Sequence, residues 1–62
     1  MVDNKVRERR KELGMTLEQL SVASGVPVST IAEIEKGVEP KITTAQHIAD
    51  ALNKSTDELW PL

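Results

Sequence analysis

Residues 16–37, TLEQLSVASGVPVSTIAEIEKG, predict two short helices joined by a tight turn. Gly25 suits the turn, because glycine takes the left-handed backbone conformation that ends a helix without steric cost. Ser21 is small at the point where the two helix backbones must approach each other closely. Apolar residues recur at helical spacing on both sides of the turn, so the two helices can bury one face together. The residues expected on that shared face are Leu20, Val26, Ile31 and Ile34.

The second of these helices, expected at residues 28–36, keeps one face free of the core. Two helices packed across such a turn form the helix-turn-helix arrangement, in which the second helix can enter the DNA major groove. The sequence therefore indicates a nucleic-acid interface on this helix. The residues expected on its free face are Val28, Ser29, Ala32, Glu33 and Lys36.

The remaining sequence predicts three further helices and no strand, so we expect an all-α bundle of five helices. We expect these helices to form one domain that spans residues 1–62. A first helix is expected at residues 4–13, with Asp3 or Asn4 as the side chain that caps its start. Two of its apolar residues are expected to face inward, Val6 and Leu13.

Capping signals mark the starts of three helices. A capping box pairs a Ser or Thr with a Glu or Gln three residues later, and each side chain accepts a hydrogen bond from a free backbone N–H. Such boxes occur at residues 16–19, 43–46 and 55–58, which places the start of the fourth helix near Thr43. The expected helix ends are marked by Gly14, Gly25, Gly37 and Pro61. The core face of the fourth helix is expected to comprise Ala45, Ile48, Ala49 and Leu52.

The composition limits the class of protein. A chain of 62 residues buries only about 60% of the surface that it exposes when unfolded, so its core is marginal and dimerisation would add stability. The chain has no cysteine, which excludes disulfides and thiolate metal sites. It has no apolar stretch long enough to span a bilayer, and its first residues lack the apolar region of a signal peptide. We therefore expect a soluble protein of the cytoplasm, associated with the nucleoid and without a membrane partner.

The net charge of −2 is unusual for a nucleic-acid binder, because such proteins are generally basic. The charges are unevenly distributed, however. Residues 1–14 carry five cationic and three acidic side chains, whereas residues 42–62 carry one cationic and three acidic side chains. A basic end and an acidic end can orient a molecule on a phosphate backbone. We expect a modest affinity from each domain.

The order of these signals resembles the Cro/CI-type, or XRE, family of helix-turn-helix repressors of phages and bacteria. The resemblance runs from Val6 to Trp60 and rests on the runs GMTLEQLS, SGVPVSTIAEIEKG, IADAL and STDELW. It implies a lambda-repressor-like fold and a transcriptional regulator, a repressor, that binds double-stranded DNA sequence-specifically as a homodimer. Two copies of the third helix would then enter successive major grooves about 34 Å apart on a pseudo-palindromic site.

The resemblance also implies roles for individual residues. Contacts with the bases would come from the third helix, through Val28, Ser29, Ala32 and Glu33. Contacts with the DNA backbone would come from Arg10, Thr16, Leu17, Lys36, Lys41 and Thr43. Arg10 would also pair with Glu35 and brace the first helix against the third. The two-fold interface of the homodimer would comprise Val38, Leu59, Trp60, Pro61 and Leu62.

This sequence departs from the family at several of these positions. Leu17 stands where family members often place a glutamine against phosphate, and Pro27 and Val28 replace polar residues at the start of the recognition helix. Glu33 puts a negative charge where a polar or basic group is more common. A carboxylate can accept a hydrogen bond from cytosine N4, and Val28 or Ala32 can pack on a thymine methyl. We therefore expect a site read through methyl contacts and one cytosine.

The same fold also serves a second class of function, a protein-interaction module such as an antitoxin or anti-repressor component. The acidic charge balance favours this alternative, as do Leu17, Val28 and Glu33. Such a module would bind a regulatory protein partner and bind DNA weakly or not at all.

The sequence does not indicate an enzyme, a cofactor or a metal site. His47 and Asp50 lie three residues apart on the fourth helix and share a face, but no further ligand, nucleophile or phosphate-binding loop accompanies them. Trp60, the single aromatic residue, fits either the core or the dimer interface, and a lone aromatic residue favours the core.

Overall fold

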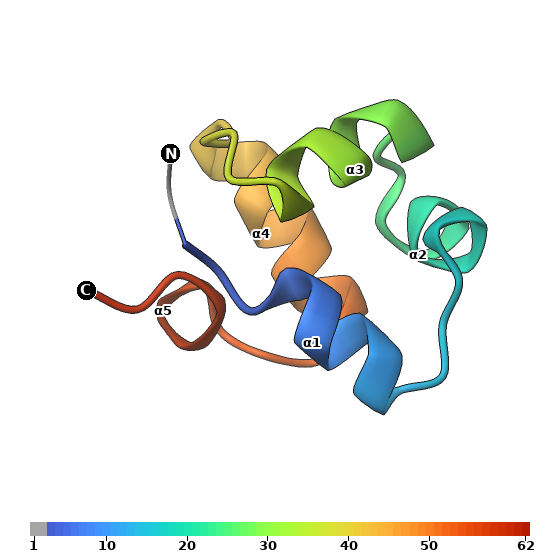
Figure 1. Ribbon diagram of the computed structural model, residues 1–62, viewed down its shortest axis with the longest axis horizontal. Helices are drawn as coiled ribbons and strands as arrows, with labels where there is room; N and C mark the ends of the chain where they lie inside the picture. Colours follow the sequence, from blue (N-terminus) through green and yellow to red (C-terminus); the bar gives the residue numbers. More distant parts are fainter. Residues whose placement is uncertain (1–2) are drawn as a thin grey trace.

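The computed structural model describes residues 3–62, and over that range it contains five helices and no strand (Figure 1). The helices are α1 (Val6–Glu12), α2 (Leu17–Ser24), α3 (Val28–Glu35), α4 (Ile42–Ala51) and α5 (Thr56–Leu59). Helix α2 packs on both α3 and α4. Helix α5 also packs on α4, and α1 packs on α3. The expected all-α bundle of five helices is confirmed. Within the described range, each helix is too short or too polar to cross a membrane.

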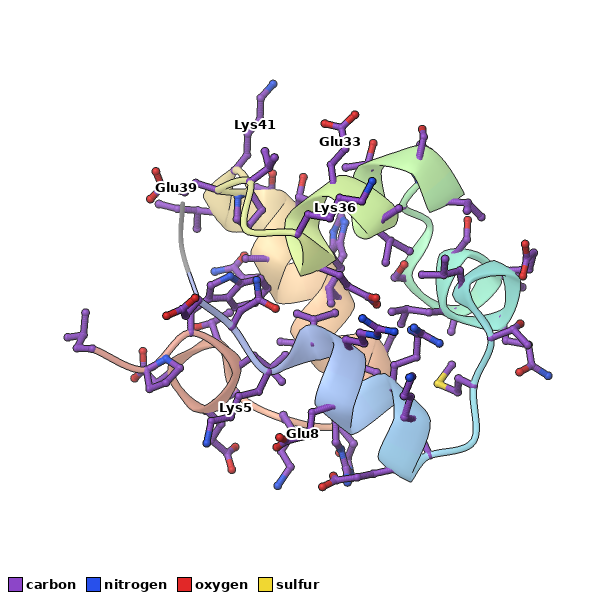
Figure 2. All side chains as sticks on the ribbon, viewed as in Figure 1. Lys5, Glu8, Glu33, Lys36, Glu39 and Lys41 are labelled. Carbon is purple, nitrogen blue, oxygen red and sulfur yellow. The ribbon has the colours of Figure 1, made fainter. Side chains whose placement is uncertain are left out.

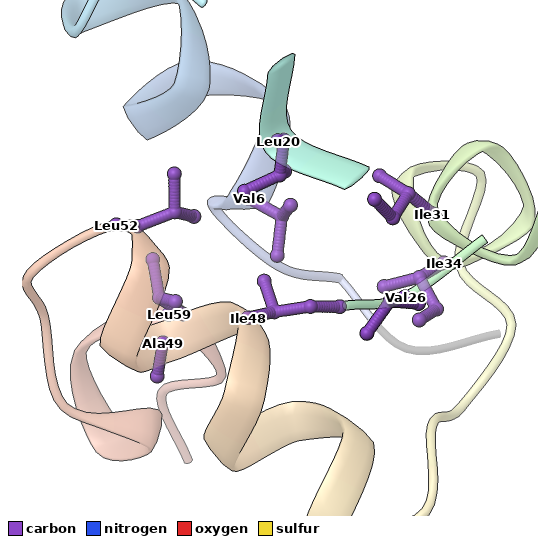
Figure 3. Packing of buried hydrophobic residues seen from close by; sticks show 9 residues of the cluster. All are labelled: Val6, Leu20, Val26, Ile31, Ile34, Ile48, Ala49, Leu52 and Leu59. Atoms are coloured by element: carbon purple, nitrogen blue, oxygen red, sulfur yellow. The ribbon is translucent and has the colours of Figure 1, made fainter. Parts of the chain in front are cut away.

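The core lies where the five helices meet, and every helix contributes to it (Figure 3). The four residues predicted on the shared face of the helix-turn-helix are all buried, as is Val6 of α1. Three of the four residues predicted on the core face of the fourth helix are buried, and the other, Ala45, is half-buried. The prediction for Leu13 is wrong, because its side chain is 44% exposed. Leu13 is the C-cap of α1, so helical periodicity no longer fixes the direction of its side chain. The buried apolar residues are Val6, Leu20, Val26, Ile31, Ile34, Ile48, Ala49, Leu52 and Leu59.

The segment before α1 is held by hydrogen bonds to two other parts of the molecule. Helix α1 begins at Val6, two residues later than predicted, and Lys5 occupies the N-cap position without a side-chain bond. Asn4 still satisfies one free donor of the helix, since its Oδ1 accepts a bond of 3.1 Å from the Val6 N–H. The Asn4 Nδ2 donates to the carbonyl of Ile34 at 2.8 Å. The Lys5 N–H donates to the carbonyl of Leu59 at 2.8 Å, which ties this segment to α5.

Two of the three predicted capping boxes are formed. Thr16 and Gln19 exchange side-chain and backbone bonds at the start of α2, and Ser55 and Glu58 do the same at the start of α5. The Ser55 N–H and hydroxyl bonds hold the pKa of the Glu58 carboxyl below its ordinary value. The box predicted at residues 43–46 is absent, because α4 already begins at Ile42 and Thr43 therefore lies inside the first turn.

The turn between α2 and α3 is closed by hydrogen bonds as well as by its glycine. Gly25 has the left-handed conformation, with φ of 75°, as predicted. The Ser21 hydroxyl donates to the Val26 carbonyl at 2.6 Å, so Ser21 bridges the two sides of the turn in addition to being small. The Ser24 hydroxyl donates to the Leu20 carbonyl at 2.7 Å and accepts a bond of 3.2 Å from the Val26 N–H. These bonds fix the angle at which α3 leaves α2.

Arg10 braces α1 against α3, as predicted. Its Nε donates to Glu35 Oε2 at 2.8 Å and its Nη2 donates to Glu35 Oε1 at 3.2 Å, while Nη1 donates to the carbonyl of Met15 at 2.8 Å. The side chains of Arg10 and Glu35 are only 10% and 8% exposed. Hydrogen bonding to Glu35 raises the pKa of the Arg10 guanidinium above its ordinary value, and burial opposes that shift.

We predict that Arg10→Ala destabilises the fold by about 3–5 kcal/mol, because it leaves the buried carboxylate of Glu35 without a partner. A domain of this size has a stability on the order of 5 kcal/mol, so the variant should keep only about 0–2 kcal/mol and unfold at a much lower urea concentration than the wild type. Urea unfolding followed by circular dichroism measures the difference.

Arg7→Ala is the matched control, because Arg7 lies on the same helix with an exposed side chain. We expect it to change stability by less than about 0.5 kcal/mol. A loss below about 1 kcal/mol for Arg10→Ala would show that the pair behaves as a solvated surface pair and does not brace α3.

Candidate nucleic-acid interface

The predicted base-contact residues do not all project equally from α3. Ser29 and Glu33 are exposed, whereas Val28 and Ala32 are half-buried against the neighbouring elements. Figure 2 shows Glu33 extending outward from α3 and Lys41 extending outward from the following loop on the same side of the view, with Lys36 in front of the α3 ribbon. The outward edge of α3 is therefore polar, and the two apolar side chains lie at its margin.

Thr30 is a further exposed residue on α3 that the sequence analysis did not select. The helical pattern gave no signal for it, because its accessibility depends on how α3 lies relative to α4. Sequence reasoning by family position favoured Val28 instead. The exposed face of α3 therefore lies nearer to α4 than the sequence predicts, since it includes Thr30 and only part of Val28.

A surface groove of about 460 Å³ runs between α3 and the start of α4. Its lining includes the core residues Val26 and Ile34 and the apolar side chains of Pro27, Val38 and Pro40, together with polar and charged side chains. Two of the predicted DNA-backbone residues, Lys41 and Thr43, line it together with the predicted base-contact residue Glu33. The other polar or charged residues of the groove are Thr30, Glu39, Thr44 and His47.

The start of α4 offers backbone donors beside this groove. The first four N–H groups of any helix have no partner within the helix. No side chain caps them here, because Lys41 occupies the N-cap position without a side-chain hydrogen bond. Together with the positive end of the helix dipole, such groups attract anions. Lys36, Lys41 and Thr43 are all exposed around this point, so this predicted backbone anchor is accessible.

The predicted anchor at the start of α2 is weaker than expected. Thr16 is exposed, but its hydroxyl accepts a bond of 3.0 Å from the Gln19 N–H. Leu17 is half-buried and packs against the core cluster, so its side chain serves the fold and only its backbone N–H, at the start of α2, could reach a phosphate.

Arg10, which is expected to contact the DNA backbone, is only 8% exposed and binds mainly within the molecule. All three of its guanidinium nitrogens donate to Glu35 or to the Met15 carbonyl inside the molecule. Arg9 is also engaged, since its Nε donates to the Leu52 carbonyl at 3.0 Å and its Nη1 contacts Glu12 at 3.3 Å. Two of the five cationic side chains that make residues 1–14 basic are therefore used internally.

The predicted dimer interface also requires a correction. Leu59 is 1% exposed and belongs to the core, so its side chain cannot contact a second copy. Trp60 is partly buried and packs against the core, in agreement with the favoured interpretation, although its Nε1 has no hydrogen-bond partner among the described residues. Val38, Pro61 and Leu62 are exposed. Ile42, which the sequence analysis did not select, is 77% exposed.

His47 and Asp50 are both exposed on α4. Among residues 3–62 there is no group of three or more His, Cys, Asp or Glu side chains placed to hold a metal ion.

Comparisons with known proteins place this geometry in a family. A family model described as helix-turn-helix matches residues 6–59. An uncharacterised HTH-type transcriptional regulator of Methanothermobacter thermautotrophicus is 46% identical over 50 residues, which cover 79% of this chain and 72% of that protein. The uncharacterised HTH-type transcriptional regulator YazB of Bacillus subtilis is 43% identical over 58 residues, which cover 92% of this chain and 84% of that protein. No solved structure matches the chain. The chain belongs to the helix-turn-helix family of DNA-binding transcriptional regulators.

Proposed function

We propose that this protein represses transcription by inserting α3 into the major groove of a specific DNA site. The observation that carries the proposal is the polar outward edge of α3, where Ser29 and Glu33 are exposed and Glu33 lines the same groove as the uncapped start of α4. A regulator that occupies its site excludes other proteins from it, so binding alone is sufficient for repression.

Contacts with the DNA backbone fall mainly to the region that follows α3. Lys36 and Lys41 supply positive charge, and the first turn of α4, with the hydroxyl of Thr43, supplies hydrogen-bond donors. Thr16 remains a second, weaker anchor at the start of α2. Contacts of this kind set the register of a protein on the duplex and carry no sequence information themselves.

Contacts with the bases fall to Ser29 and Glu33. The Glu33 carboxylate accepts a hydrogen bond from cytosine N4, and the Ser29 hydroxyl donates to or accepts from a base edge. Val28 and Ala32 are half-buried, so their remaining exposed surface contributes apolar contact with a thymine methyl at the margin of α3.

We propose that the protein acts as a homodimer, with Val38, Ile42, Trp60, Pro61 and Leu62 at the two-fold interface. Ile42 is 77% exposed at the start of α4, and α4 packs on α5, which precedes Trp60, Pro61 and Leu62. The Cα positions extend over 27 × 20 × 18 Å, so two copies side by side fit the separation of about 34 Å between successive major grooves.

The alternative of a protein-interaction module loses part of its support in the structure. Leu17, one of the residues that favoured it, is half-buried against the core and offers little surface to a partner. A regulatory protein partner remains compatible with a DNA-binding function, and the salt dependence of DNA binding distinguishes the two classes.

We predict that the logarithm of the DNA-binding constant falls linearly with the logarithm of the salt concentration, because binding to phosphates releases counterions. The double variant Lys36→Gln, Lys41→Gln should reduce the magnitude of that slope by about 2 and weaken binding to every sequence alike. Fluorescence anisotropy with duplexes from the upstream region of the gene, at several salt concentrations, measures both quantities.

The matched control is Lys5→Gln, Lys54→Gln, which changes the net charge equally at a groove between α1 and α5. Figure 2 shows Lys5 on the opposite side of the molecule from Lys36 and Lys41. Equal slopes for the two double variants would contradict the proposed orientation, and a wild type that binds no duplex in dilute buffer would overturn the function.

We predict that Glu33→Gln increases affinity for unrelated duplexes, because it removes a negative charge from the interface. It should also relax discrimination at one base pair by about 1–3 kcal/mol, since the amide no longer selects the cytosine amino group. Selection of binding sites from a randomised duplex library reports the preference at each position.

Glu39→Gln makes the same charge change on the loop after α3 and serves as the control. It should raise affinity for all sequences and leave the base preferences unchanged. An equal loss of affinity for every sequence on Glu33→Gln would argue against the proposed base contact.

We predict that the double variant Ile42→Glu, Leu62→Glu is monomeric at concentrations at which the wild type is a dimer, because it buries charge at the interface. Sedimentation equilibrium measures the change. Val22→Glu is the control, since Val22 is 86% exposed on α2, outside the proposed interface. Identical association of the wild type and both variants would contradict this assignment of the interface.

A further inference from the structure

We propose that Thr30 is a specificity-determining residue that reads the base pair next to the one read by Glu33. This inference rests on the proposed function, since it requires α3 to lie in the major groove. It adds a residue that neither the helical pattern nor the family resemblance singled out.

The first argument is the placement of Thr30 in the groove between α3 and α4. The same groove is lined by Glu33, a proposed base contact, and by Lys41 and Thr43, proposed backbone contacts. DNA that touches these three residues also covers Thr30. By contrast, the proposed contacts Val28 and Ala32 do not line this groove and are half-buried.

The second argument is the spacing of Thr30 and Glu33 along α3. Residues three apart lie on neighbouring positions of a helix surface, with a rise of about 4.5 Å between them at 1.5 Å per residue. Successive base pairs are about 3.4 Å apart along the duplex. Two side chains with this offset on one edge of a helix therefore meet adjacent base pairs.

The side chain of Thr30 has the chemistry of a base contact. The Thr30 side chain is exposed, and none of the described residues forms a hydrogen bond with its hydroxyl. A threonine hydroxyl can donate to or accept from a base edge, and its methyl group can contact a thymine methyl. The side chain carries no charge, so it contributes little to phosphate binding. Its contact with a base should therefore change the relative affinities for different bases at one position.

The test is the variant Thr30→Val, which keeps the shape and one methyl group of the side chain but removes the hydroxyl. Binding sites are first selected by the wild type from a randomised duplex library, and affinities are then measured for the selected site and its single-base variants. In the wild type, a substitution at the base pair read by Thr30 should cost about 5- to 150-fold in affinity. In Thr30→Val that penalty should fall to less than about 3-fold at this base pair, with the other positions unchanged.

Thr43→Val is the matched control, because it makes the same chemical change at a proposed DNA-backbone contact in the same groove. It should weaken binding to every sequence alike. Circular dichroism of both variants should match that of the wild type, since both side chains are exposed.

The outcomes separate the inference from the function on which it rests. If Thr30→Val keeps the wild-type preferences, or weakens all sequences uniformly as Thr43→Val does, the inference is overturned while the proposed function stands. If the altered position is not adjacent to the one altered by Glu33→Gln, the proposed register is wrong. If the wild type enriches no motif, the proposed function fails and the inference fails with it.

Discussion

The guanidinium of Arg10 is the constraint on which the position of α3 depends. A single side chain joins α1 to Glu35 at the end of α3 and to the Met15 carbonyl just before α2. A buried donor or carboxylate that loses its partner is costly, so these three elements cannot shift separately. The turn bonds of Ser21 and Ser24 fix the other end of α3. The helix that carries the proposed reading residues is therefore held at both ends by polar contacts, in addition to the packing of Ile31 and Ile34.

This bracing changes the electrostatics of the proposed interface. Arg10 and Arg9 are used inside the fold, and the exposed edge of α3 and its following loop alternate in sign, with Glu33, Lys36, Glu39 and Lys41. A surface of this kind attracts phosphate less strongly than a uniformly basic one. Free backbone N–H groups at a helix start attract anions without adding net charge, so the start of α4 can seat DNA on an acidic protein. Low attraction for arbitrary DNA leaves a larger share of the discrimination to base contacts.

The features that the sequence predicted correctly are those set by neighbouring residues. The Thr16 and Ser55 capping boxes, the left-handed Gly25 and the buried faces of α2 and α3 follow from interactions within one turn or one helix. Leu13, Leu59 and the start of α4 were assigned wrongly because they depend on where one helix stops and on which surfaces another element covers. Thr30 was missed for the same reason: its accessibility depends on the orientation of α3 relative to α4, which a helical pattern alone does not fix.

The backbone bond between Lys5 and Leu59 has a consequence for local opening of the structure. It joins the shortest helix to the segment before α1, and Asn4 in that segment is bonded in turn to Ile34 near the end of α3. Short helices near chain ends fray most readily, because few buried contacts oppose their opening. Fraying of α5 breaks the Lys5–Leu59 bond and so weakens the neighbouring hydrogen bond between Asn4 and the Ile34 carbonyl. Local opening at this end of the chain therefore reaches the recognition helix through two hydrogen bonds.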